Sequence, residues 1–150
     1  MAKTDDKFCF LDTNIIVYAS DSSSPWHQSS REKIKKLLSD GFRLFISPQI
    51  LREYVSVASR STGTEKPTPW DLILENYEDF QTYFVLLDEG RSSVNQLRQL
   101  LSKIPAAGKQ VHDANIVATM LAHNVPNLLT HNTADFSRYS KLINVIPLLK

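Results

Sequence analysis

The chain has 150 residues, of which 42% are hydrophobic and 22% charged, and its formal net charge at pH 7 is +1. This size and composition are typical of one globular domain with one core, so we expect residues 1–150 to form a single domain. The near-neutral charge excludes a strongly basic molecule but not a basic rim around an acidic site. The single cysteine, Cys9, excludes an intramolecular disulfide. We expect neither a signal peptide nor a membrane-spanning helix, and hence a cytoplasmic protein.

The first elements alternate an apolar run with amphipathic stretches. Residues 8–11 are a compact apolar run that predicts a buried strand, and residues 13–19 predict a short helix. Residues 24–39 predict a longer helix, because serine caps helices and proline fits the first helical position, and Gly41 should close it. The apolar residues expected to face inward are Ile34, Leu37 and Leu38.

The middle of the chain repeats this alternation. Residues 43–47 predict a second strand, and a serine-proline pair at 47–48 starts the next helix. Residues 61–67 are polar and contain glycine and proline, which predicts a loop. Residues 68–71 should open another helix, with Asp71 completing a capping box. The apolar residues of this last helix either fill the core, which we favour, or form a surface for a partner: Trp70, Leu72, Ile73, Tyr77 and Phe80.

The last part of the chain predicts three further strands, at 83–87, 127–130 and 143–146. Helices are predicted at 92–101, which has apolar residues on one side, and at 111–123. The apolar residues on one side of the first of these helices are Val94, Leu97, Leu100 and Leu101. Strands that alternate with helices indicate an α/β fold with a mostly parallel sheet covered on both faces.

Acidic and amide side chains follow several of the predicted strands. Asp12 comes directly after the first strand, Glu53 lies one turn into the helix after the second, and Asp113 lies in the first turn of a later helix. Asn132 and Asp135 follow the strand at 127–130. Each has an ordinary structural explanation as a cap, turn or surface residue. Their shared position is more informative, because ligands of such sheets bind beyond the carboxyl ends of the strands.

A cluster of these side chains would suit a hard cation. Carboxylate and amide oxygens are ligands for Mg²⁺ or Mn²⁺, which keep several waters and take further ligands from substrate phosphate. Such a metal supports phosphodiester hydrolysis by activating water and neutralising developing charge. No histidine or second cysteine lies at a spacing suited to zinc. Cys9 is therefore expected to be a buried apolar residue of the first strand.

The motifs around these residues resemble those of the PIN-domain family. Residues 10–19 are similar to its opening motif, a strand that ends in Asp-Thr-Asn before an apolar helix. Residues 47–54 resemble the second motif, residues 112–118 the third, and residues 129–136 the fourth, with its threonine and Asp-Phe pair. The order and spacing also match, and the resemblance covers nearly the whole chain.

This resemblance implies a central sheet between layers of helices and an enzyme that cuts RNA with Mg²⁺ or Mn²⁺. It implies that Asp12, Glu53 and Asp113 hold the metal and orient the attacking water. Family members often have an acid two residues after the threonine of the fourth motif, where this chain has Asn132. The resemblance leaves open whether Asn132 or Asp135 is the fourth ligand, and Asp135 would also join the catalytic set.

One-domain members of this length resemble the VapC-type toxins of bacterial toxin–antitoxin pairs. That resemblance implies an antitoxin protein as a partner, RNA as the substrate, a homodimer, and no association with a membrane. Basic residues would contact RNA phosphates only where they gather at the rim of the site. The candidates are Arg31, Lys35, Lys36, Arg52, Arg60, Lys109 and Arg138.

Two alternatives remain at this stage. The amide at Asn132 is compatible with a catalytically weak PIN domain that acts as an RNA-binding or regulatory module. The other alternative is an α/β metal phosphohydrolase that acts on small phosphate esters. A haloacid-dehalogenase-like enzyme needs Asp-x-Asp after the first strand, and Asn14 occupies the second acidic position here. The chain has no glycine-rich phosphate loop, which argues against a nucleoside triphosphatase.

Overall fold

The structure is a computed structural model in which residues 6–60 and 66–149 are described. Within these ranges, five strands form one parallel sheet with the order β3-β2-β1-β4-β5. The strands are β1 (Phe8–Leu11), β2 (Arg43–Ile46), β3 (Val85–Leu86), β4 (Asn127–Thr130) and β5 (Asn144–Pro147). The predicted parallel sheet is therefore confirmed.

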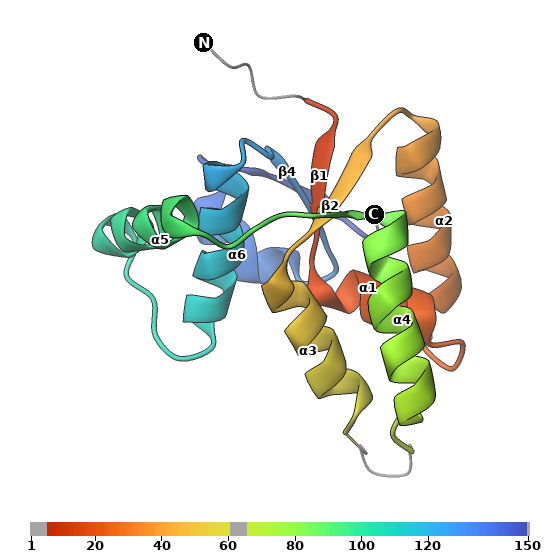
Figure 1. The fold of residues 1–150 in the computed structure, drawn as a ribbon. Coiled ribbons are helices and arrows are strands. Elements are labelled where there is room, and N and C mark those ends of the chain that lie inside the picture. The colour runs from red at the N-terminus through yellow and green to blue at the C-terminus, as the bar shows by residue number, and fades with distance from the viewer. Residues whose placement is uncertain (1–5, 61–65, 150) are drawn as a thin grey trace.

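Helices cover the sheet on both sides. In Figure 1, α5 and α6 lie on one side of the strands, and α2 and α4 lie on the other. The elements are α1 (Thr13–Ser20), α2 (His27–Ser39), α3 (Pro48–Ala58), α4 (Trp70–Tyr83), α5 (Arg91–Lys103), α6 (Gln110–Ala122) and the 3₁₀ helix η1 (Thr133–Tyr139). This arrangement confirms the predicted three-layer α/β/α class. No helix in the described ranges is long and apolar enough to cross a bilayer.

The strand order changes direction at β1. This strand pairs with β2 on one side, where Phe10 lies opposite Phe45, and with β4 on the other, where Phe10 lies opposite Leu128. The chain builds outward from β1 to β2 and β3, and then returns to the other side of β1 to form β4 and β5. A reversal of this kind opens a crevice beyond the carboxyl ends of the central strands. The sequence places acidic residues in the segments that follow these ends.

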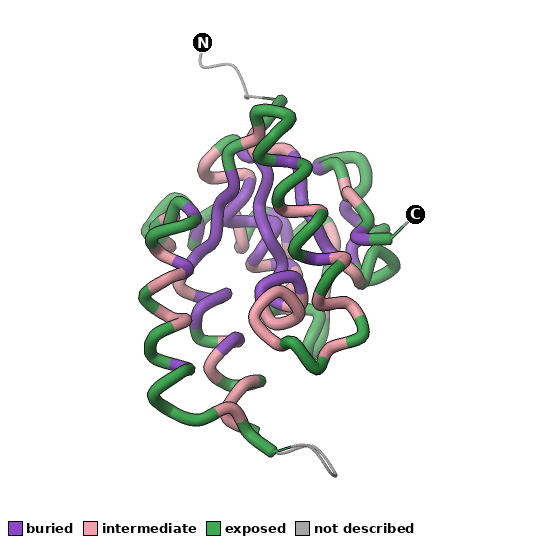
Figure 2. The backbone as a smooth tube through the Cα atoms, turned by 90° about the vertical axis from the view of Figure 1, so that its right-hand side faces the viewer, coloured by how far each residue is buried: buried purple, intermediate pink, exposed green. Residues whose placement is uncertain are grey.

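The core lies around the central strands. Figure 2 shows the buried part of the backbone concentrated in the strands, whereas the outer helices are exposed along one side. Phe10, Leu11 and Leu128 have no exposed surface, as expected for parallel strands covered on both faces. Cys9 is also fully buried, and this burial raises the pKa of its thiol to about 12. The prediction of Cys9 as a buried residue of the first strand is confirmed.

The long helix after α1 begins later than predicted. α2 starts at His27, because Ser24 and Pro25 form a turn in which the Ser24 hydroxyl accepts a hydrogen bond from Trp26 N at 3.1 Å. The predicted end is correct, and Gly41 adopts the positive φ of +90° that favours glycine. Leu37 faces the core as predicted, but Leu38 is 49% exposed because it lies on the solvent side of the helix.

The region between β2 and β3 differs most from the prediction. Residues 61–65 of the predicted loop lie outside the described residues. The expected capping box at Asp71 is wrong, because Pro69 occupies the N-cap position and makes no side-chain cap bond. α4 continues to Tyr83, which leaves only Val85–Leu86 for the strand predicted at 83–87. On α5, Leu100 is buried whereas Val94 is 65% exposed.

The apolar residues of α4 divide between the core and the surface. Ile73 and Phe80 are buried, and the Phe80 ring packs edge-on against Tyr54 of α3, with centroids 4.8 Å apart. Trp70 and Leu72 are 58% and 41% exposed, so the prediction that they fill the core is wrong. The apolar pattern predicts that a helix forms here. A helix with apolar residues on more than one side can bury only one of these sides against the core.

Candidate functional site

Asp12 lies at the carboxyl end of β1 and is the N-cap residue of α1. Its Oδ1 accepts a hydrogen bond from Thr13 N at 2.7 Å, and its Oδ2 accepts one from the Thr130 hydroxyl at 2.8 Å. The side chain of Asn14 also faces Oδ2, at 3.5 Å. Asp12 is only 8% exposed. Asp12 therefore caps α1, which is the ordinary structural explanation for an aspartate at this position. It also places a buried carboxylate where the strand order reverses.

Glu53 reaches the same region from α3. Its Oε1 accepts a hydrogen bond from the Thr13 hydroxyl at 2.5 Å, and its Oε2 accepts one from Gln49 Nε2 at 3.2 Å. Thr13 thus connects the two acids, because its backbone N–H binds Asp12 while its hydroxyl binds Glu53. The position of Glu53 is fixed by both bonds, unlike that of a solvated surface glutamate.

Asp113 lies in the first turn of α6 and is partly buried. Its pKa is raised to about 7, first by burial and then by the charges of Asp12, Asp135 and Glu53. Arg138 opposes this rise with its positive charge. α6 packs against η1, which carries Asp135, and the Gln49 side chain that binds Glu53 also binds the carbonyl of His112, next to Asp113.

The segment after β4 contributes Asn132 and Asp135. Asp135 is exposed in η1, and its charge raises the pKa of both Asp12 and Asp113. Asn132 lies just before η1, and its backbone N–H donates to the Thr130 hydroxyl oxygen at 3.0 Å. That hydroxyl in turn donates to Asp12. Asp135 therefore adds charge to the cluster, whereas Asn132 supports it through the backbone.

The acidic cluster, defined as Asp12, Glu53, Asp113 and Asp135, has an unfavourable excess of negative charge. The pKa of Asp12 is raised to about 6 by burial, with additional contributions from the charges of Glu53 and Asp135. The hydrogen bonds from Thr130 and Thr13 act in the opposite direction. Carboxyl groups with raised pKa values that repel one another are typical of sites that bind a cation or transfer protons.

The donor set fits a hard divalent cation. All the side chains of the acidic cluster offer oxygen, which is the ligand type that Mg²⁺ and Mn²⁺ prefer. Among the described residues, no three acidic, histidine or cysteine side chains converge closely enough to hold an ion by themselves. Mg²⁺ ordinarily keeps several waters and takes only a few carboxylates, with further ligands from substrate phosphate.

A polar network lies behind Glu53, and sequence reasoning missed it. Gln49 is 3% exposed and donates from Nε2 to His112 O at 2.9 Å as well as to Glu53. Its Oε1 accepts a hydrogen bond from Asn115 at 2.7 Å, and its backbone N–H donates to Glu89 at 2.7 Å. The network links α3 to the start of α6. The signals were present, because Gln49 is four residues before Glu53 and Glu89 follows the end of β3.

The basic candidates come from several separate elements. Arg138 lies near Asp113, and its guanidinium donates to Pro105 O and to Gln110 Oε1, both at 3.3 Å. Lys36 pairs instead with Asp40 at the end of its own helix, at 3.1 Å. All seven predicted basic residues are exposed, and the charge of Arg138 acts on the acidic cluster through Asp113.

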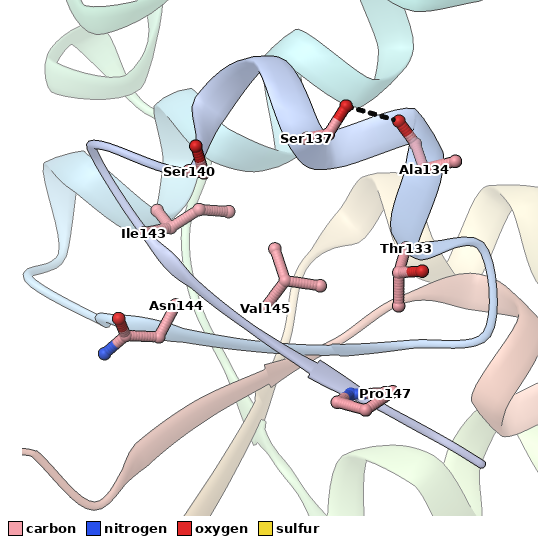
Figure 3. Close-up of a pocket in the computed structure, with 8 residues that line it drawn as sticks. All are labelled: Thr133, Ala134, Ser137, Ser140, Ile143, Asn144, Val145 and Pro147. Atoms are coloured by element: carbon pink, nitrogen blue, oxygen red, sulfur yellow. Dashed lines mark hydrogen bonds between the residues drawn. The ribbon is translucent and has the colours of Figure 1, made fainter. Parts of the chain in front are cut away.

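A hollow of about 580 Å³ lies between η1 and β5. Figure 3 shows that its lining side chains are small, apolar or neutral, and that the Ser137 hydroxyl bonds to Ala134 O within η1, at 2.9 Å. None of the eight lining residues is ionisable. The hollow itself therefore offers no acid–base group.

Comparison with known proteins gives a consistent result. The PIN domain profile matches residues 9–142. The chain is 22% identical over 131 residues to the ribonuclease VapC48 of Mycobacterium tuberculosis, which covers 86% of this chain and 90% of that protein. The structure of VapBC2 from Rickettsia felis, bound to a DNA fragment from their promoter, has a TM-score of 0.67 at 18% identity and covers 93% of this chain and 98% of that one. The Mycobacterium tuberculosis VapC20, a sarcin-ricin loop cleaving toxin, has a TM-score of 0.59 at 16% identity, with coverage of 80% and 86%.

Proposed function

Because this chain belongs to the PIN-domain family, we propose that it is a metal-dependent endoribonuclease that acts as a VapC-type toxin. The observation that supports this most strongly is the acidic cluster, in which burial and mutual repulsion raise the pKa of Asp12 to about 6 and that of Asp113 to about 7. VapC48 is named a ribonuclease, and VapC20 is described as a toxin that cleaves the sarcin-ricin loop. Both descriptions support RNA as the substrate.

In this proposal, Asp12, Glu53 and Asp113 hold Mg²⁺ or Mn²⁺, directly or through the waters that such an ion keeps. We assign the fourth acidic position to Asp135, because its charge acts on both Asp12 and Asp113. Asn132 could add only a neutral amide oxygen to this set. When bound, the cation would lower the pKa of a water nucleophile and neutralise charge on the phosphodiester during hydrolysis.

The surrounding residues have positioning roles in this mechanism. Thr130 and Thr13 hold Asp12 in one orientation through bonds of 2.8 and 2.7 Å. Gln49 fixes Glu53 and also holds the backbone carbonyl of His112. The acids are thus arranged before substrate binds, which reduces the reorganisation needed during the reaction. The hydrogen bonds also favour the ionised form of Asp12, the form that binds a cation.

We further propose an antitoxin protein as the partner of this chain and a homodimer as its assembly. The similar structures include a toxin–antitoxin complex from Klebsiella pneumoniae. Exposed apolar residues on α4, including Trp70 at 58% and Leu74 at 57%, provide surface that a protein partner would bury. Copurification of the chain with its coexpressed antitoxin, and the mass of each species in solution, test both parts.

The test of the activity is cleavage of a mixed pool of structured and single-stranded RNA by the purified protein. Reactions would contain Mg²⁺, Mn²⁺ or EDTA and would compare wild type with Asp12→Asn. Asp40→Asn is the matched control, because Asp40 is an exposed aspartate at the end of α2 that pairs with Lys36. The expected result is metal-dependent cleavage by wild type and the control, with none by Asp12→Asn.

Binding of RNA without cleavage under every condition would instead support the RNA-binding or regulatory module. Hydrolysis of a small phosphate ester with no effect on RNA would support the other alternative. Cleavage that persists at the same rate in EDTA and in Asp12→Asn would reject the proposed metal-dependent site.

A further inference from the structure

Three aromatic rings form a cluster beside the acidic cluster. The ring centroid of Trp26 lies 4.9 Å from that of Tyr18 and 4.7 Å from that of His131, and the last two are 5.7 Å apart. The rings come from α1, from the turn before α2 and from the residue after β4. All three residues are only partly buried. The contacts hold the turn in place and leave part of the aromatic surface accessible.

This aromatic cluster is connected to Asp12 through one residue. The backbone N–H of His131 donates to Asn14 Oδ1 at 3.3 Å, and the other end of the Asn14 amide faces Asp12 Oδ2 at 3.5 Å. Burial raises the pKa of Tyr18, and the charge of Asp12 adds to this rise, which agrees with their proximity. The aromatic cluster and the acidic cluster are therefore neighbours at the same end of the sheet.

A cavity of about 500 Å³ lies next to the aromatic cluster, between α1, the turn before α2 and the facing ends of α3 and α4. Tyr18 and Trp26 line it together with two cations, Arg60 and Lys66. One acid, Asp21, also lines it, and its Oδ1 accepts two hydrogen bonds from a neighbouring serine, at 3.0 and 2.6 Å. The volume falls within the range of small-ligand sites, and a nucleotide needs this combination of an aromatic face with nearby positive charge.

We propose that this cavity binds one unpaired base of a single-stranded RNA, stacked against Trp26. Arg60 and Lys66 would contact the adjoining phosphates, and the strand would continue past His131 toward Asp12. This inference rests on the proposed function, because it assigns a binding subsite to the same RNA substrate. The bases of an RNA duplex are already stacked on one another, so the cavity would select loops and single-stranded ends.

Tryptophan fluorescence tests the contact directly. The chain has two tryptophans, and the second, Trp70, is 58% exposed on α4 and does not line the cavity. Trp70→Phe leaves Trp26 as the only indole, and Trp26→Phe leaves Trp70, which makes a matched pair. Each would be titrated with a short single-stranded RNA oligonucleotide in EDTA, and then with the same sequence as a duplex.

The expected result is quenching of Trp26 by the single strand, weak quenching by the duplex, and no quenching of Trp70. An abasic nucleotide placed at successive positions should abolish the quenching at one position only. In a binding assay, Trp26→Leu should weaken the affinity by about 5- to 100-fold, the range for loss of one stacked base. Tyr83→Leu is the control, because Tyr83 is 71% exposed and lies outside the cavity.

Unchanged Trp26 fluorescence in the presence of saturating single-stranded RNA would overturn the inference. This measurement keeps Trp26 in place, so it does not depend on the folding of Trp26→Leu. The failures of the two proposals are distinguishable. Quenching without any cleavage would reject the nuclease and keep the base-binding site, whereas metal-dependent cleavage without quenching would reject the base-binding site alone.

Discussion

Replacing Asp12 by asparagine is expected to stabilise the metal-free protein above pH 7 while abolishing its activity. Burial, with the charges of Glu53 and Asp135, raises the pKa of Asp12 from 3.8 to about 6 in the folded protein. The unfolded chain has the ordinary value, so the folded state binds this proton more tightly. Below about pH 4 the ionisation of Asp12 therefore does not affect the free energy of unfolding. This free energy decreases as the pH rises from about 4 to about 6, and above that the decrease is complete.

The size of the effect follows from the shift in pKa. A rise from 3.8 to about 6 corresponds to about 3 kcal/mol lost from the free energy of unfolding above pH 7. Asparagine removes the charge and keeps one oxygen to accept from Thr13 N, and its amide can donate to the Thr130 hydroxyl oxygen. The increase in the free energy of unfolding caused by Asp12→Asn should therefore have this value as its upper limit. A less favourable hydrogen bond between the asparagine amide and Thr130 would reduce it.

The assay is urea unfolding of wild type and Asp12→Asn in EDTA, at pH values below and above the titration of Asp12. Asp40→Asn serves as the control for a charge change at an exposed site. With Mg²⁺ the order should reverse above pH 7, because cation binding stabilises only a folded protein with an intact site. If Asp12→Asn is less stable than wild type in EDTA by the same amount at every pH, then Asp12 is not a destabilised buried charge and the reasoning is refuted.

Three further perturbations test the surroundings of the acids. Gln49→Leu should lower kcat by about 10- to 100-fold, with a smaller change in KM, because it releases Glu53; steady-state kinetics will show the split. Thr130→Val removes a donor to Asp12, so the acid limb of the pH–rate profile should move to higher pH, whereas an unshifted profile would contradict this role. Cys9 should resist alkylation by iodoacetamide in the native protein and react fully in urea, because burial raises the pKa of its thiol to about 12.

The location of the site was predictable because it depends on strand ends rather than on side-chain detail. A compact apolar run that stops at Asp12 fixes the end of β1, and parallel strands place their carboxyl ends along one edge. Once Thr130 is recognised as the end of another such strand, the proximity of Asp12 and Asp135 follows from topology. Periodicity does not predict the strand order itself, since pairing between β1 and β4 joins segments that are distant in sequence.

The apolar positions that were wrongly predicted share a physical cause. Local patterns indicate that a helix exists, but the exposed face depends on which neighbour packs against it. Leu38 and Trp70 each continue an apolar pattern and yet lie on the surface, at 49% and 58% exposure. The error at Ser24 has a local cause: this residue has the pattern of a helix cap, but its hydroxyl binds Trp26 N and stabilises a turn that precedes the helix.

The amide at Asn132 has a consequence for the balance of charge in the proposed site. The four carboxylates of the acidic cluster already repel one another strongly enough to contribute to the raised pKa values of Asp12 and Asp113. An acid at 132 would add another negative charge beside Thr130. The backbone N–H of residue 132 donates to the Thr130 hydroxyl oxygen at 3.0 Å, and the hydroxyl hydrogen is directed at Asp12. This backbone bond does not depend on the side chain at 132, so the effect of asparagine there is on charge alone: it limits repulsion in the metal-free protein.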